Sequence, residues 1–224
     1  MARQIIDAGG LGEVYFARVN ECGGNGLQSL KPLKDAKKYF GMEWGYLLQG
    51  GCHPIQLSRV LFDREPAKRV FAAIRHYKHP DPKIDDTALL TIEFEGGQIA
   101  WIDACIYALG TFDDRAEIYG TKGSIFVDLY RQNPLTVYSQ VGYGTIGAGQ
   151  WGMPGGIGTG WGFPIPDEER SLGYFHEQQA WLNSLIKDEE HLQNFEDGRA
   201  TLEIIFAAYK SGETGNAVSL PLAE

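Results

Sequence analysis

The sequence predicts an α+β domain built on one large, open and mostly antiparallel β-sheet, with helices packed on one face. Three observations predict it: short apolar segments with strand-like alternation, short turns between them, and two later segments with helical spacing of apolar residues. Strands joined by short connections pair in antiparallel fashion, because a parallel pair needs a long crossover. Roughly six or seven such strands suit one broad sheet.

The elements follow one another in a simple order. A helix is expected over residues 2–8, because the glycines that follow end it, and the alternation of residues 13–20 predicts a strand. Residues 53–62 have helical spacing. β-Branched and aromatic residues between turn signals predict the remaining strands: 67–77, 87–95, 98–107, 116–119, 124–128 and 135–139. Two more helices, 172–186 and 195–211, precede a closing strand at 217–220.

Length and composition limit the possible functions. The chain has 224 residues, of which 43% are hydrophobic, which predicts a single folded domain over residues 1–224 with a glycine- and aromatic-rich loop insertion at 141–171. A net charge of −9 argues against nucleic-acid binding, and no apolar run is long enough to span a membrane. Cys22, Cys52 and Cys105 are widely spaced, so free thiols and a cytoplasmic location are expected.

Two of the predicted strands are apolar on both faces. Val70 and Ala72 alternate with Phe71 and Ala73, and residues 89–94 show the same pattern. Because the helices cover only one face of the sheet, the other face is expected to be buried by a second subunit. The sequence therefore predicts a homo-oligomer, in its simplest form a homodimer, that associates through the sheet face.

One histidine lies where a glycine-rich approach becomes a helix. His53 follows Gly50-Gly51 and precedes Pro54, a residue tolerated in the first helical turn. A helix N-terminus suits a side chain that transfers a proton or holds an anionic group. We therefore take His53 as the leading candidate for the site, with a histidine that only caps the helix as the alternative.

Other polar pairs are better explained by structure than by chemistry. The pairs Asp85-Asp86 and Asp113-Asp114 could be glycosidase carboxylates, but acids at strand ends are more often turn residues, and Arg115 is available as an ion-pair partner. His76 and His79 have a spacing that places them on opposite faces of a strand, which is poor metal-ligand geometry, so no metal is expected.

Several blocks, in this order and spacing, resemble one known family. They are GEVYFAR (12–18), GGCHPI (50–55) with Arg59, DDTALLTIEFEGG (85–97), FDDRAEIYGTKGSI (112–125), GYFHE (173–177) and DGRATLEIIFAAY (197–209). Together they resemble the glucose–fructose oxidoreductase, inositol dehydrogenase and rhizopine-catabolism (Gfo/Idh/MocA) family. The resemblance covers nearly the whole chain and is weakest over 21–45 and 140–170.

The resemblance implies that cofactor binding and substrate binding belong to different domains. Family members have an N-terminal Rossmann domain that binds NAD(P) and a C-terminal α/β domain that binds substrate and builds the oligomer. This chain resembles only the second part: no G-x-G-x-x-G motif follows a strand, and the family's Glu-Lys-Pro segment is absent. No cofactor is therefore expected in this chain, and NAD(P) is implied for the full-length family. The chain is interpreted as either a truncation or a natural stand-alone domain.

The resemblance also assigns roles to residues near His53. The family's histidine commonly works beside an aspartate four residues earlier, which is Gln49 here, and Gln56 replaces an acidic residue three positions later. Glutamine can orient a hydroxyl but cannot take its proton. His53 is the one catalytic candidate. The expected substrate-binding residues are Lys38, Trp44, Tyr46, Gln49, His53, Gln56, Trp151, Trp161 and His176.

These observations lead to one function and two alternatives. The first is the substrate-binding and oligomerisation domain of an NAD(P)-dependent sugar or polyol oxidoreductase, which is not evidently able to transfer a hydride alone. The alternatives are a non-catalytic homo-oligomeric binding module and a cofactor-independent carbohydrate hydrolase or lyase that uses His53. Whether the chain by itself is an enzyme is left open.

Overall fold

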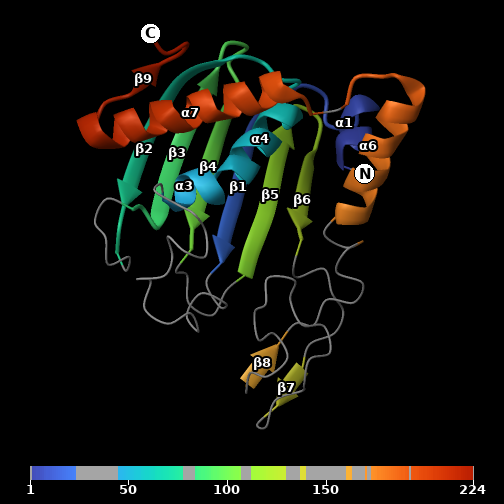
Figure 1. Ribbon diagram of the computed structural model, residues 1–224, viewed down its shortest axis with the longest axis horizontal. Helices are drawn as coiled ribbons and strands as arrows, with labels where there is room; N and C mark the ends of the chain where they lie inside the picture. The colour runs from blue at the N-terminus through green and yellow to red at the C-terminus, as the bar shows by residue number, and fades with distance from the viewer. Residues whose placement is uncertain are drawn as a thin grey trace.

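The main sheet is the centre of the fold, as a computed structural model shows (Figure 1). The structure describes residues 2–23, 45–77, 84–106, 112–129, 137–139, 160–162, 170, 173–191 and 193–223. The sheet has seven strands in the order β6-β5-β1-β4-β3-β2-β9. These strands are β1 (Val14–Gly23), β2 (Ala67–Arg75), β3 (Thr87–Phe94), β4 (Ile99–Cys105), β5 (Phe112–Gly120), β6 (Ser124–Asp128) and β9 (Val218–Ser219).

Strand pairing confirms the mostly antiparallel prediction, with one exception. β1 pairs with β4 in parallel, with Arg18 opposite Trp101, whereas its pairing with β5 on the other side is antiparallel. β1 occupies a central position between two strands that come much later in the chain, which a rule based on consecutive short connections could not predict. The sheet is therefore mixed.

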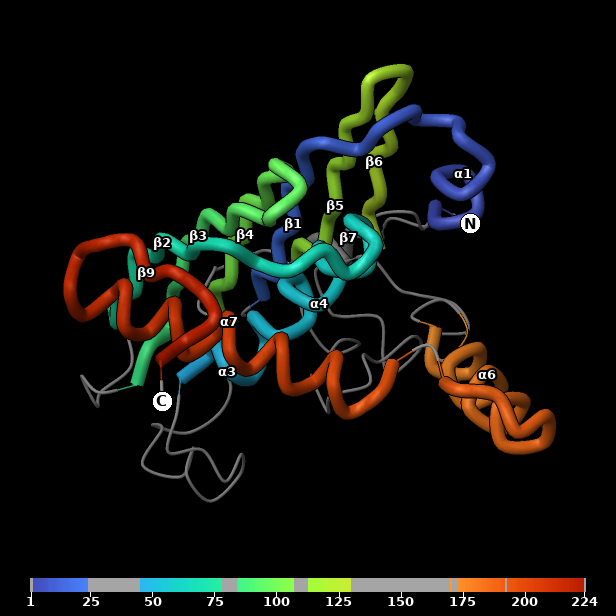
Figure 2. The backbone as a smooth tube through the Cα atoms, turned by 90° about the horizontal axis from the view of Figure 1, so that it is seen from above, coloured from blue at the N-terminus to red at the C-terminus, as the bar shows by residue number. Residues whose placement is uncertain are grey.

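Three helices cover one face of the sheet. They are α3 (Tyr46–Gln49), α4 (Cys52–Leu61) and α7 (Phe195–Thr214), and Figure 2 shows them together on one side of the strands. α4 packs on β1 and β4, and α7 packs on β2. The core lies between these layers and is apolar: it includes Ala17, Val19, Leu47, Ile55, Val70, Leu90, Ile92, Ile102, Ile118, Ile204 and Ile205.

The remaining elements lie around this layered core. α1 (Ala2–Asp7) precedes β1, and α6 (Tyr174–Lys187) precedes α7 but buries none of its residues. β7 (Val137–Ser139) and β8 (Gly160–Gly162) form a separate two-stranded sheet, so the strand predicted at 135–139 does not join the main one. Most of the predicted insertion at 141–171 lies outside the described residues.

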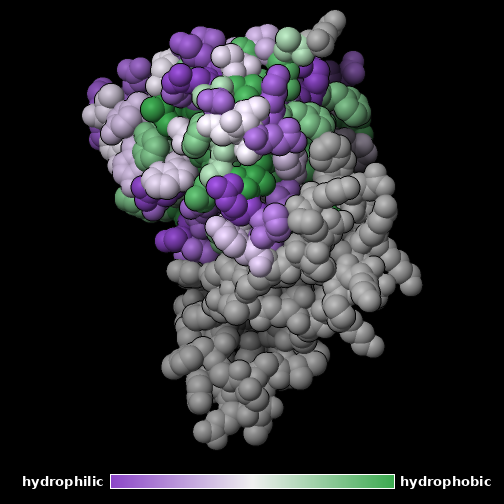
Figure 3. All heavy atoms as spheres, turned by 90° about the vertical axis from the view of Figure 1, so that its left-hand side faces the viewer, coloured by the Kyte–Doolittle hydropathy of each residue, from purple (hydrophilic) through white to green (hydrophobic). Residues whose placement is uncertain are grey.

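The second face of the sheet carries large exposed side chains. Phe71, Leu89 and Trp101 are each nearly half exposed, and Phe126 is 70% exposed. The side of the molecule at the edge formed by β2 and β9 is mixed in hydropathy: Figure 3 shows hydrophilic and hydrophobic side chains intermixed there. The three cysteines are free thiols. Among the described residues, none of the helices has the length and apolar character that crossing a bilayer requires.

Candidate functional site

The glycines before His53 allow α3 and α4 to pack closely against each other. A Cβ atom on Gly50 would lie 2.3 Å from Cζ of the Tyr46 ring, and one on Gly51 would lie 2.6 Å from the Leu47 carbonyl oxygen. Both distances are too short for any larger residue. The glycine-rich motif is therefore explained by packing: it lets the Tyr46 ring lie directly on the turn that leads into α4.

His53 lies in the first turn of α4, as the sequence predicted. Its backbone N–H donates to the Gly50 carbonyl at 3.0 Å, and no side chain caps this helix. The side chain is exposed, yet nearby protein atoms desolvate the ring enough to lower the pKa of His53, and the charge of Glu177 partly offsets this shift. The imidazole is therefore neutral at pH 7 and able to accept a proton or a hydrogen bond.

α3 is held on one side by Asp85, which lies in the approach to β3. Asp85 Oδ2 accepts from the Leu47 N–H at 2.8 Å, and Oδ1 accepts from the Tyr209 hydroxyl at 2.8 Å. The Asp85 carbonyl also accepts from the Tyr46 N–H at 3.0 Å. A Cβ on Gly45 would lie 1.8 Å from Asp85 Oδ1, so this carboxylate is packed directly against the start of α3.

On the other side, α3 is held by Glu21 of β1. The Tyr46 hydroxyl donates to Glu21 Oε1 at 3.0 Å, and Glu21 lies directly opposite Asp114 of β5 in the strand register. Burial, together with the charge of Asp114, raises the pKa of Glu21 to about 8. Burial, together with Asp113 and Asp128, raises the pKa of Asp114 to about 7. Among the described residues, Asp114 Oδ1 has no hydrogen-bond partner.

The two thiols near this pair are poor nucleophiles. Burial raises the pKa of Cys52 to about 11, with a contribution from Glu21, and its Sγ–H donates to the Gln49 carbonyl at 3.2 Å. Burial raises the pKa of Cys22 to about 12. Both thiols are therefore protonated at neutral pH, which argues against thiolate chemistry at this site.

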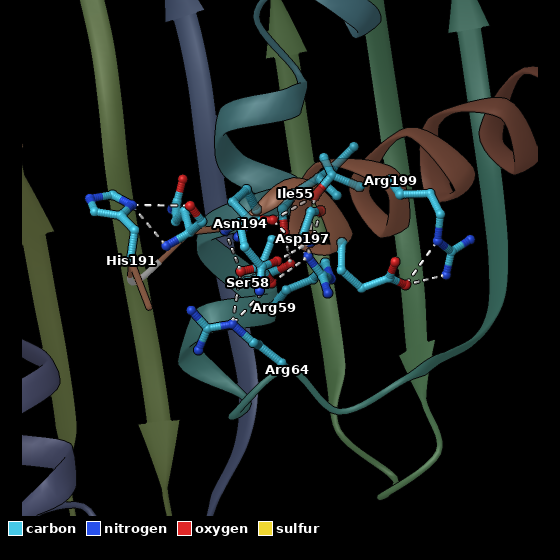
Figure 4. A network of polar contacts seen from close by, with 12 residues as sticks. Ile55, Ser58, Arg59, Arg64, His191, Asn194, Asp197 and Arg199 are labelled. Carbon is cyan, nitrogen blue, oxygen red and sulfur yellow. Dashed lines mark hydrogen bonds and ion pairs between the residues drawn. The ribbon is translucent and has the colours of Figure 1, made fainter. Parts of the chain in front are cut away.

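α4 is fixed to α7 by a buried charged cluster (Figure 4). Arg59 Nη1 donates to the backbone carbonyl of Asp197 at 2.9 Å and to its Oδ1 at 3.2 Å. Arg64 Nε contacts the same carboxylate at 2.9 Å. The Gln56 side-chain oxygen accepts from Arg59 at 2.8 Å and from the Thr201 hydroxyl at 2.5 Å. We call these five residues the Asp197 cluster.

The structure brings together only some of the predicted substrate-binding residues. Tyr46, Gln49, His53 and Gln56 lie within the α3–α4 unit. The Gln56 oxygen is engaged with α7, whereas Gln49 Oε1 is buried without a partner among the described residues. His176 is in the first turn of α6, next to the Glu177 that acts on His53.

The other predicted residues cannot be compared with the structure. Lys38, Trp44 and Trp151 lie outside the described residues, and Trp161 is described only through its backbone in β8. Their roles in substrate binding remain predictions.

Sequence reasoning missed Glu21 and did not separate Asp114 from Asp113. Asp113 is ion-paired as expected, because Arg115 Nε contacts its Oδ1 at 2.5 Å. Asp114 points to the opposite, helix-covered face. Strand alternation contained this signal: Glu21 continues the inward series of Ala17 and Val19, and a carboxylate in that series is unusual.

Asp85 and Asp86 make structural contacts. Asp86 is fully buried and accepts from the Tyr77 N–H and from the Thr87 hydroxyl. Together with the contacts of Asp85, this favours the structural interpretation of the pair over a glycosidase site. Among the described residues no group of His, Cys, Asp or Glu side chains could hold a metal ion, and His79 lies outside them.

The starts of α3 and α7 do not offer a free cradle for a dinucleotide phosphate. A Rossmann site needs free amides at a helix start that follows a parallel strand. At α3 the Leu47 amide is bound by Asp85, and at α7 the Asn194 side chain accepts from the Asp197 amide in a capping box. Both helix starts already hold side-chain oxygens, so we assign no reaction step here to NAD(P).

Comparison with known proteins points to one family. The family model for the GFO/IDH/MocA C-terminal domain matches residues 1–126. Myo-inositol 2-dehydrogenase from Thermotoga maritima is 23% identical over 221 residues, which cover 97% of this chain and 59% of that enzyme. An uncharacterised oxidoreductase, YrbE of Bacillus subtilis, is 46% identical over 52 residues, or 23% of this chain and 15% of its own length.

Solved structures show the same fold. GenD2 from gentamicin A biosynthesis, in complex with NAD, matches with a TM-score of 0.80 at 22% identity, over 98% of this chain and 59% of that one. Scyllo-inositol dehydrogenase from Lactobacillus casei, with bound NAD(H) and scyllo-inositol, matches with a TM-score of 0.71 at 21% identity, over 97% and 60%. The chain thus spans about three fifths of the length of these relatives.

Proposed function

Because the chain belongs to the Gfo/Idh/MocA family through its C-terminal domain, we propose that it forms the substrate-binding and oligomerisation part of an NAD(P)-dependent sugar or polyol oxidoreductase. Relatives named as myo-inositol and scyllo-inositol dehydrogenases support a cyclic polyol as the substrate class. The substrate site we propose is the turn between α3 and α4.

The single observation that carries this proposal is the placement of His53. A neutral, exposed imidazole lies at a helix start, beside a turn whose glycines and two carboxylate anchors hold its backbone in place. Near it, the side-chain oxygen of Gln49 is without a partner among the described residues. A hydroxyl can donate to the exposed imidazole, and a polyol offers several hydroxyls in a fixed arrangement.

The chemistry that these residues provide is proton acceptance and orientation. A neutral imidazole accepts a proton from a hydroxyl that is being oxidised, and Glu177 stabilises the imidazolium that results. Gln49 orients the hydroxyl without competing for its proton. NAD(P), when bound by the part of such an enzyme that this chain does not match, supplies the hydride acceptor.

Ligand binding by the purified chain tests this function. We expect myo-inositol to give a saturable signal in saturation-transfer NMR and His53→Ala to weaken binding at least tenfold. His191→Ala is the matched control, because His191 lies between α6 and α7 and, among the described residues, its ring bonds only the backbone of Gln193. Unchanged binding in His53→Ala, or tight binding of NADH with none of the polyol, would contradict the proposal.

The oligomerisation role rests on the uncovered face of the sheet. At its centre the Arg18 guanidinium lies 4.9 Å from the centroid of the Trp101 ring and contacts Glu117 at 3.1 Å. Tyr119 stacks on Phe16 beside them, with ring centroids 5.6 Å apart. Arginine and aromatic residues are enriched in protein interfaces, and this cluster lies among large exposed apolar side chains.

Solution mass measurement tests the oligomer. We expect light scattering after size exclusion to give a multiple of the 24.8 kDa chain mass, and Trp101→Glu to lower it toward the monomer. Phe195→Glu is the control, because Phe195 is 99% exposed at the start of α7, away from this face. A wild-type monomer, or an oligomer that Trp101→Glu leaves intact, would rule this interface out.

A further inference from the structure

Glu21 and Asp114 form an unusual cross-strand pair. They lie directly opposite each other on β1 and β5, on the face that α3 and α4 cover. Residues opposite each other in an antiparallel pair have Cβ atoms roughly 5 Å apart, and two like charges at such a position are destabilising. Both side chains are partly buried, so solvent screens their repulsion less than it would on the surface.

Within the described part of the chain, the groups that act on the pair do not neutralise it. On the neighbouring strands these are Cys22, Asp113 and Asp128, and on the helices they are Tyr46 and Cys52. None of these carries a positive charge, and no basic side chain of the described residues is among the groups that act on either carboxyl. Asp103 of β4 adds a further acid near Cys22.

One proton resolves this arrangement. If a single proton is shared, one carboxyl donates to the other, and the buried Asp114 Oδ1, which otherwise has no partner in the described structure, gains a hydrogen bond. The Tyr46 hydroxyl then stabilises the one remaining negative charge from the other side, at 3.0 Å from Glu21 Oε1. A proton shared by two facing carboxyls belongs to the pair rather than to either residue.

We propose that Glu21 and Asp114 hold one proton between them and that this singly protonated pair, acting through Tyr46, positions the turn that carries His53. Glu21 is thus a positioning residue. It reaches the turn through Tyr46, whose ring lies against Gly50 at a distance that admits no Cβ. The consequence for ligand binding rests on the proposed function, but the shared proton does not.

Loss of this proton is expected to lower the stability of the folded chain. The shared proton is the last proton that the pair loses, and burial moves the pKa of that loss from the ordinary carboxyl range to about 7 to 8, so its stabilising effect is present at lower pH and is lost as the pH rises through 7 to 8. Above that range two adjacent charges repel each other at the end of β1. The turn at His53 then loses one of its two anchors and keeps the one at Asp85.

Unfolding measured against pH, without any ligand, tests the pair. Between pH 5.5 and 8.5 we expect the wild-type Tm to fall by about 5 °C. Glu21→Gln and Asp114→Asn, which are neutral at every pH, should remove most of this slope. Glu95→Gln, in the exposed turn between β3 and β4, is the control and should keep it. A Glu21→Gln slope equal to the wild type would overturn the proposal.

Two NMR measurements complete the test. In the wild type, the carboxyl carbons of Glu21 and Asp114 should show one titration near or above pH 7, and both titrating below pH 5 would overturn the shared proton even if the variants fail to fold. The His53 ring signal should show a second inflection in the same pH range, present in Glu95→Gln and absent in Glu21→Gln. A merely structural Glu21 would leave the His53 titration unchanged.

Discussion

The contact between α4 and α7 and the contact between α3 and β1 both depend on buried polar side chains, but they are built in opposite ways. In the Asp197 cluster one carboxylate lies between two arginines, and a glutamine and a threonine complete the hydrogen bonds. At Glu21 two carboxyls face each other with one phenol as donor. In the first arrangement opposite charges meet, which we call balanced, whereas in the second like charges meet, which we call unbalanced.

This difference in charge pairing suggests that the Asp197 cluster has a structural role and that the Glu21–Asp114 pair is better suited to a functional one. A balanced buried network holds two elements in a single arrangement at every pH where its charges persist. An unbalanced one costs stability, and such sites are where proteins tend to carry chemistry or regulation. The unbalanced pair lies beneath the turn of His53, and the balanced cluster fixes the rest of α4 behind it.

The largest expected effect is in the Asp197 cluster. Asp197→Ala removes the counter-charge of buried Arg59 and the cap contact to Asn194, so we expect a loss of about 3–5 kcal/mol in the free energy of unfolding. Urea denaturation measures it. Glu196→Ala, which removes only the exposed contact to Arg199, should change stability little. A loss no larger than that of Glu196→Ala would show that the cluster does not hold α4 to α7.

Gly50→Ala should destabilise the turn next most strongly. The added Cβ would overlap the Tyr46 ring, and forcing the ring away costs roughly 1–3 kcal/mol. It should also weaken polyol binding, because the backbone at His53 moves. Gly198→Ala in α7 is the matched control: nothing lies within 4 Å of its Cβ, so it should stabilise the helix by up to about 1 kcal/mol. Equal effects of the two alanines would contradict the packing account.

The two clusters should respond to opposite ends of the pH range. Burial alone would raise the pKa of Asp197, but the hydrogen bond and charge of Arg64, with Arg59, hold it below its ordinary value. Its contribution is complete above about pH 4 and is lost as the pH falls further. In a pH series of unfolding curves, Asp197→Asn should flatten the acid limb and Glu21→Gln the alkaline limb. If either variant flattens both limbs, the clusters are not independent.

Thr201→Val should have the smallest effect. It removes the hydrogen bond to Gln56 Oε1 and a long one, 3.4 Å, from Arg59 Nη1. Arg59 still donates to Gln56 Oε1, so we expect a loss of about 1 kcal/mol. Calorimetry can detect a change of this size. A loss as large as that of Asp197→Ala would mean that the hydroxyl, rather than the ion pairs, holds α7.

Much of the fold could be predicted from local patterns, because strand alternation and turn residues act over short distances. The predicted helix at 53–62 differs from α4 by one residue at each end, and β6 matches the predicted range of 124–128. The parallel pairing of β1 with β4 and the separate β7–β8 sheet were not predicted, since both depend on contacts between distant parts of the chain. α3 was too short to show a periodic pattern.

The site was harder to predict for a similar reason. His53 could be chosen from its place between glycines and an amphipathic helix. Gln56 was assigned to substrate from its position relative to His53, yet its oxygen bonds Thr201, a residue 145 positions away. Glu21 could not be identified as a site residue from the sequence. Its partner, Asp114, lies 93 residues later and becomes its neighbour only when β1 pairs with β5.

We propose that the turn between α3 and α4 binds a polyol. Titrating isotope-labelled chain with myo-inositol, while recording backbone amide shifts, tests it most directly. We predict saturable shifts at Gly50, Gly51 and His53 in the wild type, strongly reduced in His53→Ala, with Gly198 and Glu95 unmoved in both. Binding without shifts at this turn, or identical shifts in His53→Ala, would contradict the claim.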